Sequence, residues 1–168
     1  GRASFPLAYD PAKTIEDACQ AIGASYEGTK TGTFGIMGCF SFHPMKVLSC
    51  AGDGGAITCG NASLAGELRK LRNHGDGPGY YGYNSRLDNL QAAILNVKLP
   101  YLDSFIDRRR DIARRYEAEL PEWVKKPPAP SDGLYFDTYS SYVIGGSPEL
   151  LAHMREQGIE CFSHIRTD

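Results

Sequence analysis

Residues 38–46 read Gly38-Cys39-Phe40-Ser41-Phe42-His43-Pro44-Met45-Lys46. The apolar and aromatic residues at the start of this stretch predict a short strand, and Pro44 ends it. Lys46 follows, and a glycine-rich turn, Gly52-Asp53-Gly54-Gly55, comes soon after it. Turns of this kind place side chains at the end of a strand, where binding sites form in α/β proteins. The pattern therefore predicts an α/β core with Lys46 at the edge of its sheet.

An acidic segment lies upstream, with the sequence Ile15-Glu16-Asp17-Ala18-Cys19-Gln20. Pyridoxal phosphate needs a lysine amine to hold its aldehyde as a Schiff base and a carboxylate to keep its pyridine nitrogen protonated. Asp17 and Lys46 can supply both groups. Each residue alone has an ordinary alternative, since most lysines are solvated and most aspartates lie in caps or turns. The pair, together with the strand and turn around Lys46, favours this cofactor.

Five blocks of the sequence together resemble one known family. They are Ile15-Glu16-Asp17-Ala18-Cys19-Gln20-Ala21, residues 38–46, Gly52-Asp53-Gly54-Gly55-Ala56, Arg72-Asn73-His74-Gly75 and Gly82-Tyr83-Asn84-Ser85-Arg86-Leu87-Asp88-Asn89-Leu90-Gln91-Ala92-Ala93. Over nearly its whole length the chain is similar to the DegT/StrS group of sugar aminotransferases. These are fold-type-I enzymes that depend on pyridoxal 5'-phosphate and aminate keto sugars carried on nucleotides. Five blocks in the same order are hard to produce by chance.

The resemblance implies a role for individual residues around the cofactor. Lys46 forms the Schiff base and Asp17 pairs with the pyridinium nitrogen, so these two are the catalytic candidates. Gln20 lies beside the phenolic oxygen of the ring, and Ser41 binds the phosphate. A hydroxyl suits a phosphate dianion, which accepts several hydrogen bonds at once. The lysine amine then shuttles the proton once the amino donor has displaced it.

The resemblance also implies a homodimer. In this family the asparagine of the Gly-Tyr-Asn-x-Arg block reaches across the dimer interface to the phosphate of the partner's cofactor. That role falls to Asn84 in trans, with Arg86 beside it. The glycine- and tyrosine-rich residues 76–83 form either a packed surface loop or part of the interface, and the resemblance favours the interface.

The resemblance divides the chain into two regions. Residues 1–100 correspond to the C-terminal part of the cofactor-binding large domain, and residues 101–168 to the interdomain helix and a partial α+β small domain. The boundary is expected near Tyr101. Family members have more strands and helices before the acidic segment and more segments at the end, so we expect a fragment that lacks both. Residues 1–14 contain two prolines and lack the apolar strand that should lead into the acidic segment.

Residues 15–57 alternate short apolar runs with turn residues, which predicts strands, and three helices follow. The first helix has Ser63 as a candidate N-cap and Gly75 as the C′ residue. Pro100 separates the second helix from the third, which ends near Leu120. The predicted core stripes are Leu64, Leu68 and Leu71 in the first, Leu87, Leu90, Ile94 and Val97 in the second, and Leu102, Phe105, Ile106, Ile112, Ala113 and Tyr116 in the third.

Arginines 108–110 and 114–115 are predicted to lie largely on the solvated face of the third helix, because acidic neighbours balance their charge. Residues 125–133 are rich in proline and predict an extended connection. The last part of the chain then predicts a partial α+β lobe. Its elements are a strand at residues 140–145, a helix at 148–157 ended by Gly158, and a second short strand at 158–165.

Composition predicts an ordinary soluble globular protein, with 42% hydrophobic and 23% charged residues and a net charge of −2. This charge gives no electrostatic reason to expect nucleic acid, and no apolar run is long enough to cross a membrane. Five cysteines without close pairing and four histidines without i, i+4 spacing predict neither a disulfide framework nor a metal site. No signal-peptide pattern is present, so we expect a cytoplasmic protein.

These observations predict a transaminase that moves an amino group, from glutamate, to a nucleotide-linked keto sugar. An alternative is a catalytically inactive remnant of the same fold that acts as a dimerisation or ligand-binding module. A dinucleotide-binding domain built on Gly52-Asp53-Gly54-Gly55 is a weaker reading, because the G-x-G-x-x-G order is absent.

Overall fold

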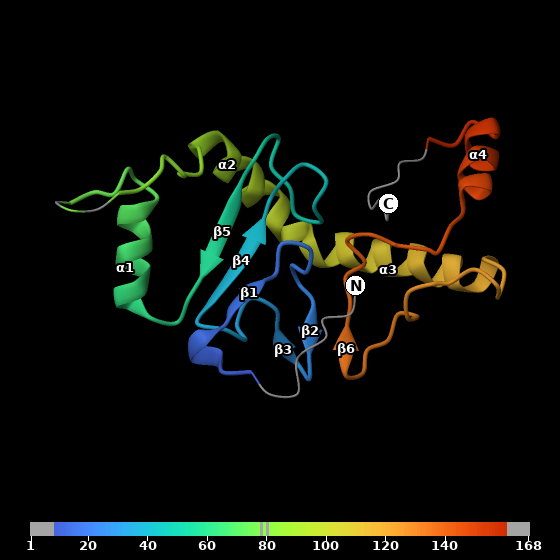
Figure 1. The fold of residues 1–168 in the computed structure, drawn as a ribbon, viewed down its shortest axis with the longest axis horizontal. Coiled ribbons are helices and arrows are strands. Elements are labelled where there is room, and N and C mark those ends of the chain that lie inside the picture. Colours follow the sequence, from blue (N-terminus) through green and yellow to red (C-terminus); the bar gives the residue numbers. More distant parts are fainter. Residues whose placement is uncertain (1–8, 78, 80, 161–168) are drawn as a thin grey trace.

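The computed structural model describes residues 9–77, 79 and 81–160. Its main sheet contains β1 (Ile15–Asp17), β4 (Met37–Ser41) and β5 (Gly55–Thr58), in the order β1-β4-β5. β1 runs parallel to β4, and β5 runs antiparallel to β4 (Figure 1). The strand predicted at the start of residues 38–46 is thus confirmed. Gly38 is required within it, because a Cβ there would collide with the backbone of Gly32.

A short 3-10 helix, η1 (Pro11–Lys13), precedes the main sheet. Asp10 caps η1 by accepting a 3.0 Å hydrogen bond from the backbone N–H of Ala12. Pro11 therefore lies outside the sheet, as its chemistry requires. The strand before the site is short: β1 contains only three residues and ends on Asp17.

A second, smaller sheet pairs residues that are far apart in the chain. β2 (Ser25–Tyr26) lies between β3 (Thr29–Lys30) and β6 (Tyr135–Phe136), and both pairings are antiparallel. The two residues between β2 and β3 both have positive φ, as in the type I′ turns that suit tight hairpins. This sheet joins residues from both sides of the domain boundary expected near Tyr101, and that boundary stays a prediction.

Helix α1 (Ala62–Leu71) confirms the first predicted helix but begins at another cap. Oδ1 of Asn61 accepts hydrogen bonds from the backbone N–H groups of Ser63 at 2.9 Å and Leu64 at 3.1 Å. The prediction of Ser63 as the N-cap was therefore wrong. Asparagine and serine cap helices about equally well, and Asn61 comes first along the chain.

Helices α2 (Asn89–Lys98) and α3 (Leu102–Glu119) follow one another through a 3-10 turn, η2 (Leu99–Tyr101). Pro100 lies in η2, where its missing N–H breaks the α-helical hydrogen-bond pattern. The predicted interruption is confirmed. Figure 1 shows this helix pair running through the middle of the molecule, between α1 at one end and α4 (Pro148–Glu156) at the other.

Helix α4 confirms the helix predicted near residues 148–157, and Gly158 follows it with a φ of +76°. The strand predicted at residues 140–145 was wrong, because the structure assigns no strand there. This segment is held by contacts other than a sheet ladder, including a 2.8 Å bond from the N–H of Gly145 to the carbonyl of Lys125. The strand predicted at 158–165 falls mostly outside the described residues.

The main buried cluster lies between the loop after β4 and helix α2. Leu48, Cys50 and Leu95 form its centre, and the partly buried residues packed around it are Ile22, Phe42, Leu87 and Leu102. The stripe predicted for α2 was partly wrong, since Leu90 is 71% and Val97 is 70% exposed. The helix instead turns Leu95 inward. The helical face that contacts the loop is therefore different from the face on which Leu90 and Val97 lie.

Candidate functional site

The candidate site lies at one edge of the main sheet. β1 and β4 are parallel, so their carboxyl ends meet at the same edge, the position where α/β proteins build sites. β1 ends on Asp17, which is in register with Cys39, and β4 ends on Ser41. Lys46 follows on the loop beyond Ser41. The sheet therefore brings a carboxylate, a hydroxyl and a lysine to the same edge.

The carboxylate of Asp17 is anionic and lies in the electrostatic field of Lys46. Hydrogen bonds from the thiol and backbone N–H of Cys19 hold the pKa of Asp17 below its usual range; the Lys46 charge also lowers it, whereas partial burial opposes these effects. The backbone bond is 3.1 Å long. Burial raises the pKa of the Cys19 thiol, so this group stays protonated, and its Sγ donates to the carbonyl of Cys39 at 3.6 Å.

Backbone turns fix the loop that carries Lys46. Its N–H donates to the carbonyl of His43 at 2.9 Å, and the N–H of Cys50 donates to the carbonyl of Phe42 at 2.7 Å. The hydroxyl oxygen of Ser41 accepts a 3.3 Å bond from the N–H of His43. Because this bond uses an oxygen lone pair, the Ser41 hydroxyl hydrogen stays available to an anion.

Helix α2 anchors the same loop from the other side. Nζ of Lys98 donates to the carbonyl and to the hydroxyl oxygen of Ser49, at 2.8 and 3.0 Å. Oε1 of Gln91 accepts a 2.9 Å bond from the N–H of Ala51. These contacts explain why α2 presents Gln91, Leu95 and Lys98 to the loop in place of the predicted apolar stripe.

The predicted phosphate residue Asn84 lies in a small two-stranded structure after α1, which we call the carboxamide clasp (residues 71–75 and 82–86). Asn73 and Asn84 form an antiparallel bridge, and the N–H of Ser85 donates to the carbonyl of Arg72 at 2.9 Å. Arg86 donates from Nε to Oδ1 of Asn84 at 2.9 Å and from Nη1 to Oδ1 of Asn73 at 3.0 Å. One guanidinium thus holds two carboxamides.

Gly75 lies inside this clasp and was wrongly predicted as the C′ residue of the first helix. Helix α1 ends at Leu71 and Arg72 is its C-cap. Gly75 follows later, buried, with a φ of +71°, and its N–H donates to the carbonyl of Lys70 at 2.9 Å. Its left-handed conformation forms a turn within the clasp, and glycine adopts this conformation without strain.

Gln20 lies just after β1 and contacts a distant part of the chain. Its Oε1 accepts a 3.1 Å hydrogen bond from the hydroxyl of Ser140. Ser140 follows β6 and is held to helix α3 by Arg109, whose Nη1 donates to the carbonyl of Ser140 at 3.1 Å. The edge that carries Asp17 is thereby connected to the C-terminal third of the chain.

Comparison with known proteins agrees with this architecture. The family model described as the DegT/DnrJ/EryC1/StrS aminotransferase family matches residues 10–166. The chain belongs to this family. Its mixed helix and strand architecture is part of the fold-type-I aminotransferase fold, as the sequence predicts.

Three members of the DegT/DnrJ/EryC1/StrS family illustrate the similarity. A pleiotropic regulatory protein of Geobacillus stearothermophilus is 45% identical over 86% of this chain and 41% of its own length. A dTDP-3-amino-3,4,6-trideoxy-alpha-D-glucose transaminase of Streptomyces venezuelae is 39% identical over 89% of this chain and 41% of its own. The crystal structure of a family aminotransferase from Brucella abortus gives a TM-score of 0.78 at 39% identity, covering 86% of this chain and 40% of that one. The chain thus spans about two fifths of these relatives' length.

The structure places the predicted site residues of this DegT-family chain in two groups. Asp17, Gln20, Ser41 and Lys46 lie at or beside the edge of the main sheet, whereas Asn84 lies in the carboxamide clasp. Within the described residues, no hydrogen bond or ion pair joins the clasp to the other four. The roles of all five residues stay predictions.

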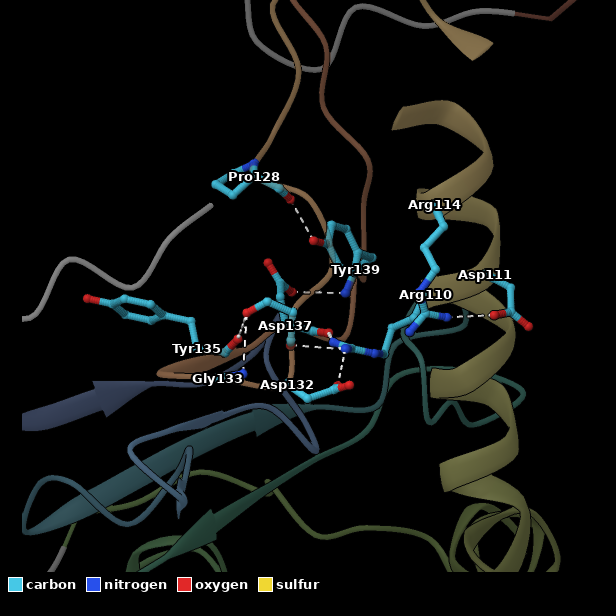
Figure 2. A network of polar contacts seen from close by, with 10 residues as sticks. Arg110, Asp111, Arg114, Pro128, Asp132, Gly133, Tyr135, Asp137 and Tyr139 are labelled. Atoms are coloured by element: carbon cyan, nitrogen blue, oxygen red, sulfur yellow. Dashed lines mark hydrogen bonds and ion pairs between the residues drawn. The ribbon is translucent and has the colours of Figure 1, made fainter. Parts of the chain in front are cut away.

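Sequence reasoning missed the buried arginine that organises the segment after β6. Arg110 was placed on the solvated face of its helix, but it is only 2% exposed. Figure 2 shows its guanidinium pointing from α3 toward the chain on both sides of β6, where it pairs with Asp132 before the strand and donates to the carbonyl of Asp137 after it at 2.8 Å. The signal lay in the spacing, because Ile106, Arg110 and Ala113 fall on one buried helical face.

Elsewhere in the described part of the chain, neither a cavity nor a cluster of metal-binding side chains adds a second site. A cavity of about 490 Å³ lies between the β4–β5 pair and α1, and its lining includes Ile57, Leu68 and Arg72 but none of the predicted site residues. The described part of the chain holds no group of three His, Cys, Asp or Glu residues able to bind a metal. None of its helices has the length and apolar character that crossing a membrane requires.

Proposed function

We propose that this chain carries the cofactor-anchoring part of a transaminase that uses pyridoxal 5'-phosphate to move an amino group from glutamate to a nucleotide-linked keto sugar. The observation that carries the proposal is the parallel pairing of β1 and β4, which brings Asp17, Ser41 and the loop with Lys46 to one edge of the main sheet. The transaminase of S. venezuelae supports the substrate class. Because the chain spans about two fifths of such relatives, the activity is proposed for the whole protein.

The residues at this edge fit pyridoxal phosphate. A carboxylate kept ionised by Cys19 can pair with a positively charged pyridine nitrogen, and Lys46 offers the amine that would hold the aldehyde. The hydroxyl of Ser41 and the carboxamide of Asn84 are the kinds of donor that a phosphate accepts. Bound here, the cofactor supplies an electron sink for the charge left when a proton leaves the amino donor.

Asp17, Lys46 and Gln20 each have a separate role in this proposal. Asp17 keeps a fixed negative charge in place, because its carboxylate is tied to the backbone of Cys19 at the end of β1. Lys46 moves the proton, since its backbone is held by His43 while its four-carbon stem leaves the amine free to travel. Gln20 offers an amide donor to the phenolic oxygen of the ring.

We also propose that the protein works as a homodimer in which Asn84 serves the cofactor phosphate of the partner subunit. Asn84 is exposed and belongs to the clasp, which leaves it available to another chain. Leu90 and Val97 on the neighbouring helix α2 are exposed apolar side chains of the kind that subunit interfaces cover. In this proposal residues 1–100 belong to the large domain, and residues 101–168 form the interdomain helix and the small domain.

Borohydride trapping tests the proposed function. The whole protein, purified with pyridoxal phosphate, should be yellow, and reduction should fix the cofactor to Lys46, as peptide mapping can show. Lys46→Ala should lose both colour and label. Lys13→Ala is the matched control, because Lys13 is 84% exposed and only pairs with Asp10. Asp17→Ala should lose activity before it loses cofactor. A colourless protein that folds and dimerises would overturn the proposal in favour of a non-catalytic module.

A further inference from the structure

The hydrogen bond between Ser140 and Gln20 joins two segments that are 120 residues apart in the chain. Gln20 follows β1 directly, beside the proposed cofactor site. Ser140 belongs to residues 137–140, which follow β6 and which we call the α3-bound segment. The contact is therefore a tertiary link between the cofactor edge and the C-terminal part of the chain.

Two neighbouring arginines of α3 hold the α3-bound segment in place. Nη1 of Arg109 donates to the carbonyls of Tyr139 at 3.4 Å and Ser140 at 3.1 Å. Nη1 of Arg110 donates to the carbonyl of Asp137 at 2.8 Å (Figure 2). The guanidinium also lies 4.1 Å from the ring centre of Phe136. Because guanidinium groups offer rigid donor geometry, they fix this backbone closely.

The segment is also locked from within. Oδ1 of Asp137 accepts a 2.9 Å bond from the N–H of Tyr139, and the hydroxyl of Tyr139 donates to the carbonyl of Pro128 at 2.6 Å. Tyr139 has a φ of +47°, a left-handed conformation that is unfavourable for a bulky residue. Such a conformation persists where the surroundings impose it, and it often occurs at functional sites. The strained turn comes directly before Ser140.

We propose that Ser140 is a positioning residue that sets the orientation of the Gln20 carboxamide. An amide carries an acceptor oxygen on one side and an N–H2 donor on the other. Because the hydroxyl of Ser140 engages Oε1, the Nε2 donor is directed away from Ser140 and is available to an oxygen acceptor. This inference rests on the proposed function, in which the acceptor is the phenolic oxygen of the cofactor ring. Arg109 and Arg110 act through Ser140 by holding its backbone.

Loss of the hydroxyl lets the amide turn over. In Ser140→Ala the Gln20 oxygen can face the phenolic oxygen, so one favourable hydrogen bond is replaced by a repulsive pair of acceptors. A donor to the phenolic oxygen stabilises its deprotonated form. The pH midpoint of the visible absorbance band of bound cofactor should therefore move upward in Ser140→Ala and in Gln20→Ala, in the same direction. Cofactor affinity should fall roughly fivefold, the loss expected for one hydrogen bond.

A comparison of five variants on the cofactor-loaded protein tests the inference. Ser140→Thr keeps the hydroxyl and should behave as wild type, and Ser141→Ala is the control on the exposed neighbour. The double variant Gln20→Ala/Ser140→Ala should shift the midpoint no further than Gln20→Ala alone, because both changes act through one group. A midpoint that moves in Gln20→Ala but not in Ser140→Ala would overturn the inference.

A measurement without cofactor separates this inference from the proposed function. The side-chain N–H2 resonances of Gln20 in the cofactor-free protein report the contact itself, and they should move in Ser140→Ala but not in Ser141→Ala. Unchanged Gln20 resonances would overturn the inference even if Lys46 is labelled by borohydride. Absence of any label would overturn the proposed function instead, whatever the resonances show.

Discussion

Arg86 donates a 2.9 Å hydrogen bond from Nε to Oδ1 of Asn84. A guanidinium has only donors, so the carboxamide must face it with its oxygen. The N–H2 group of Asn84 is therefore directed away from Arg86, toward whatever lies outside the clasp. The same argument applies to Asn73, whose Oδ1 accepts from Nη1 of Arg86 at 3.0 Å. A single cation thus orients two outward-facing amide donors.

Arg86→Ala should weaken cofactor binding in the assembled protein roughly fivefold, as expected when one well-oriented hydrogen bond to the phosphate is lost. Arg86→Lys should recover only part of the affinity, because an ammonium lacks the fork that reaches both amide oxygens. A spectroscopic titration with pyridoxal phosphate measures the effect. Arg115→Ala is the control, since it removes only an exposed ion pair with Glu119. Equal affinities for Arg86→Ala and wild type would contradict this role.

Gly82→Ala should open the carboxamide clasp. A Cβ at Gly82 would collide with the carbonyl oxygen of Leu71 and the backbone nitrogen of Gly75, neither of which is the end of a flexible side chain. We expect a loss of about 1–3 kcal/mol in the free energy of unfolding, the cost of a steric clash in a packed site. Thermal or urea denaturation measures it.

Gly66→Ala is the matched control for Gly82→Ala. A Cβ at Gly66 meets no atom within 4 Å, and the residue lies inside helix α1. Alanine has a higher helix propensity than glycine, so this variant should be more stable than wild type by about 0.5–1 kcal/mol. Similar destabilisation in both variants would mean that backbone collision does not explain the need for Gly82.

The chemical pattern of the sequence was enough to predict the strand before Lys46 and the helices α3 and α4. Short-range rules govern these features, because alternation, periodicity and proline act within a few residues. The ends of β1 and β4 at Asp17 and Ser41, and the parallel pairing that brings them together, are findings of the structure. The family resemblance was carried by these same blocks.

The features that the sequence did not reveal depend on tertiary contacts. Helix α2 turns Leu95 inward and Leu90 outward because Gln91 and Lys98 bind the loop after β4, and hydrophobicity takes no account of such bonds. Arg110 is buried because the carbonyls and the ring it binds come from β6 and its neighbours, more than twenty residues away. The pattern of charged residues around Arg110 predicts only a solvent-exposed position for it.

Arg110→Ala should be one of the most destabilising substitutions in α3. It removes the bonds to the carbonyls of Asp137 and Ser131 and the contact with the Phe136 ring, and it leaves partly buried carbonyls without a donor. We expect a loss of about 2–4 kcal/mol in the free energy of unfolding. Arg108→Ala, on the exposed face of the same helix, should change it by less than about 0.5 kcal/mol. If urea denaturation gave the same loss for Arg110→Ala and Arg108→Ala, the burial of Arg110 would contribute nothing to the free energy of unfolding.

Tyr139→Phe should change how stability depends on alkaline pH. Burial, aided by the nearby carboxylate of Asp137, raises the pKa of Tyr139 from 10.0 to about 12. The folded pKa lies above the unfolded one, so the contribution of Tyr139 is fully present below pH 10 and is lost as pH rises toward 12. Phenylalanine cannot ionise, and it also lacks the hydroxyl bond to the carbonyl of Pro128.

At neutral pH wild type should therefore be more stable than Tyr139→Phe by about 1 kcal/mol, the typical net value of one hydrogen bond. Between pH 10 and 12 this advantage should shrink, because the unfolded tyrosine ionises while the folded one does not. Comparing the two proteins at each pH cancels the titration of every other group. Tyr101→Phe is the control, since Tyr101 is 59% exposed. A wild-type advantage that stays constant up to pH 12 would show that Tyr139 ionises as easily in the folded protein as in the unfolded chain.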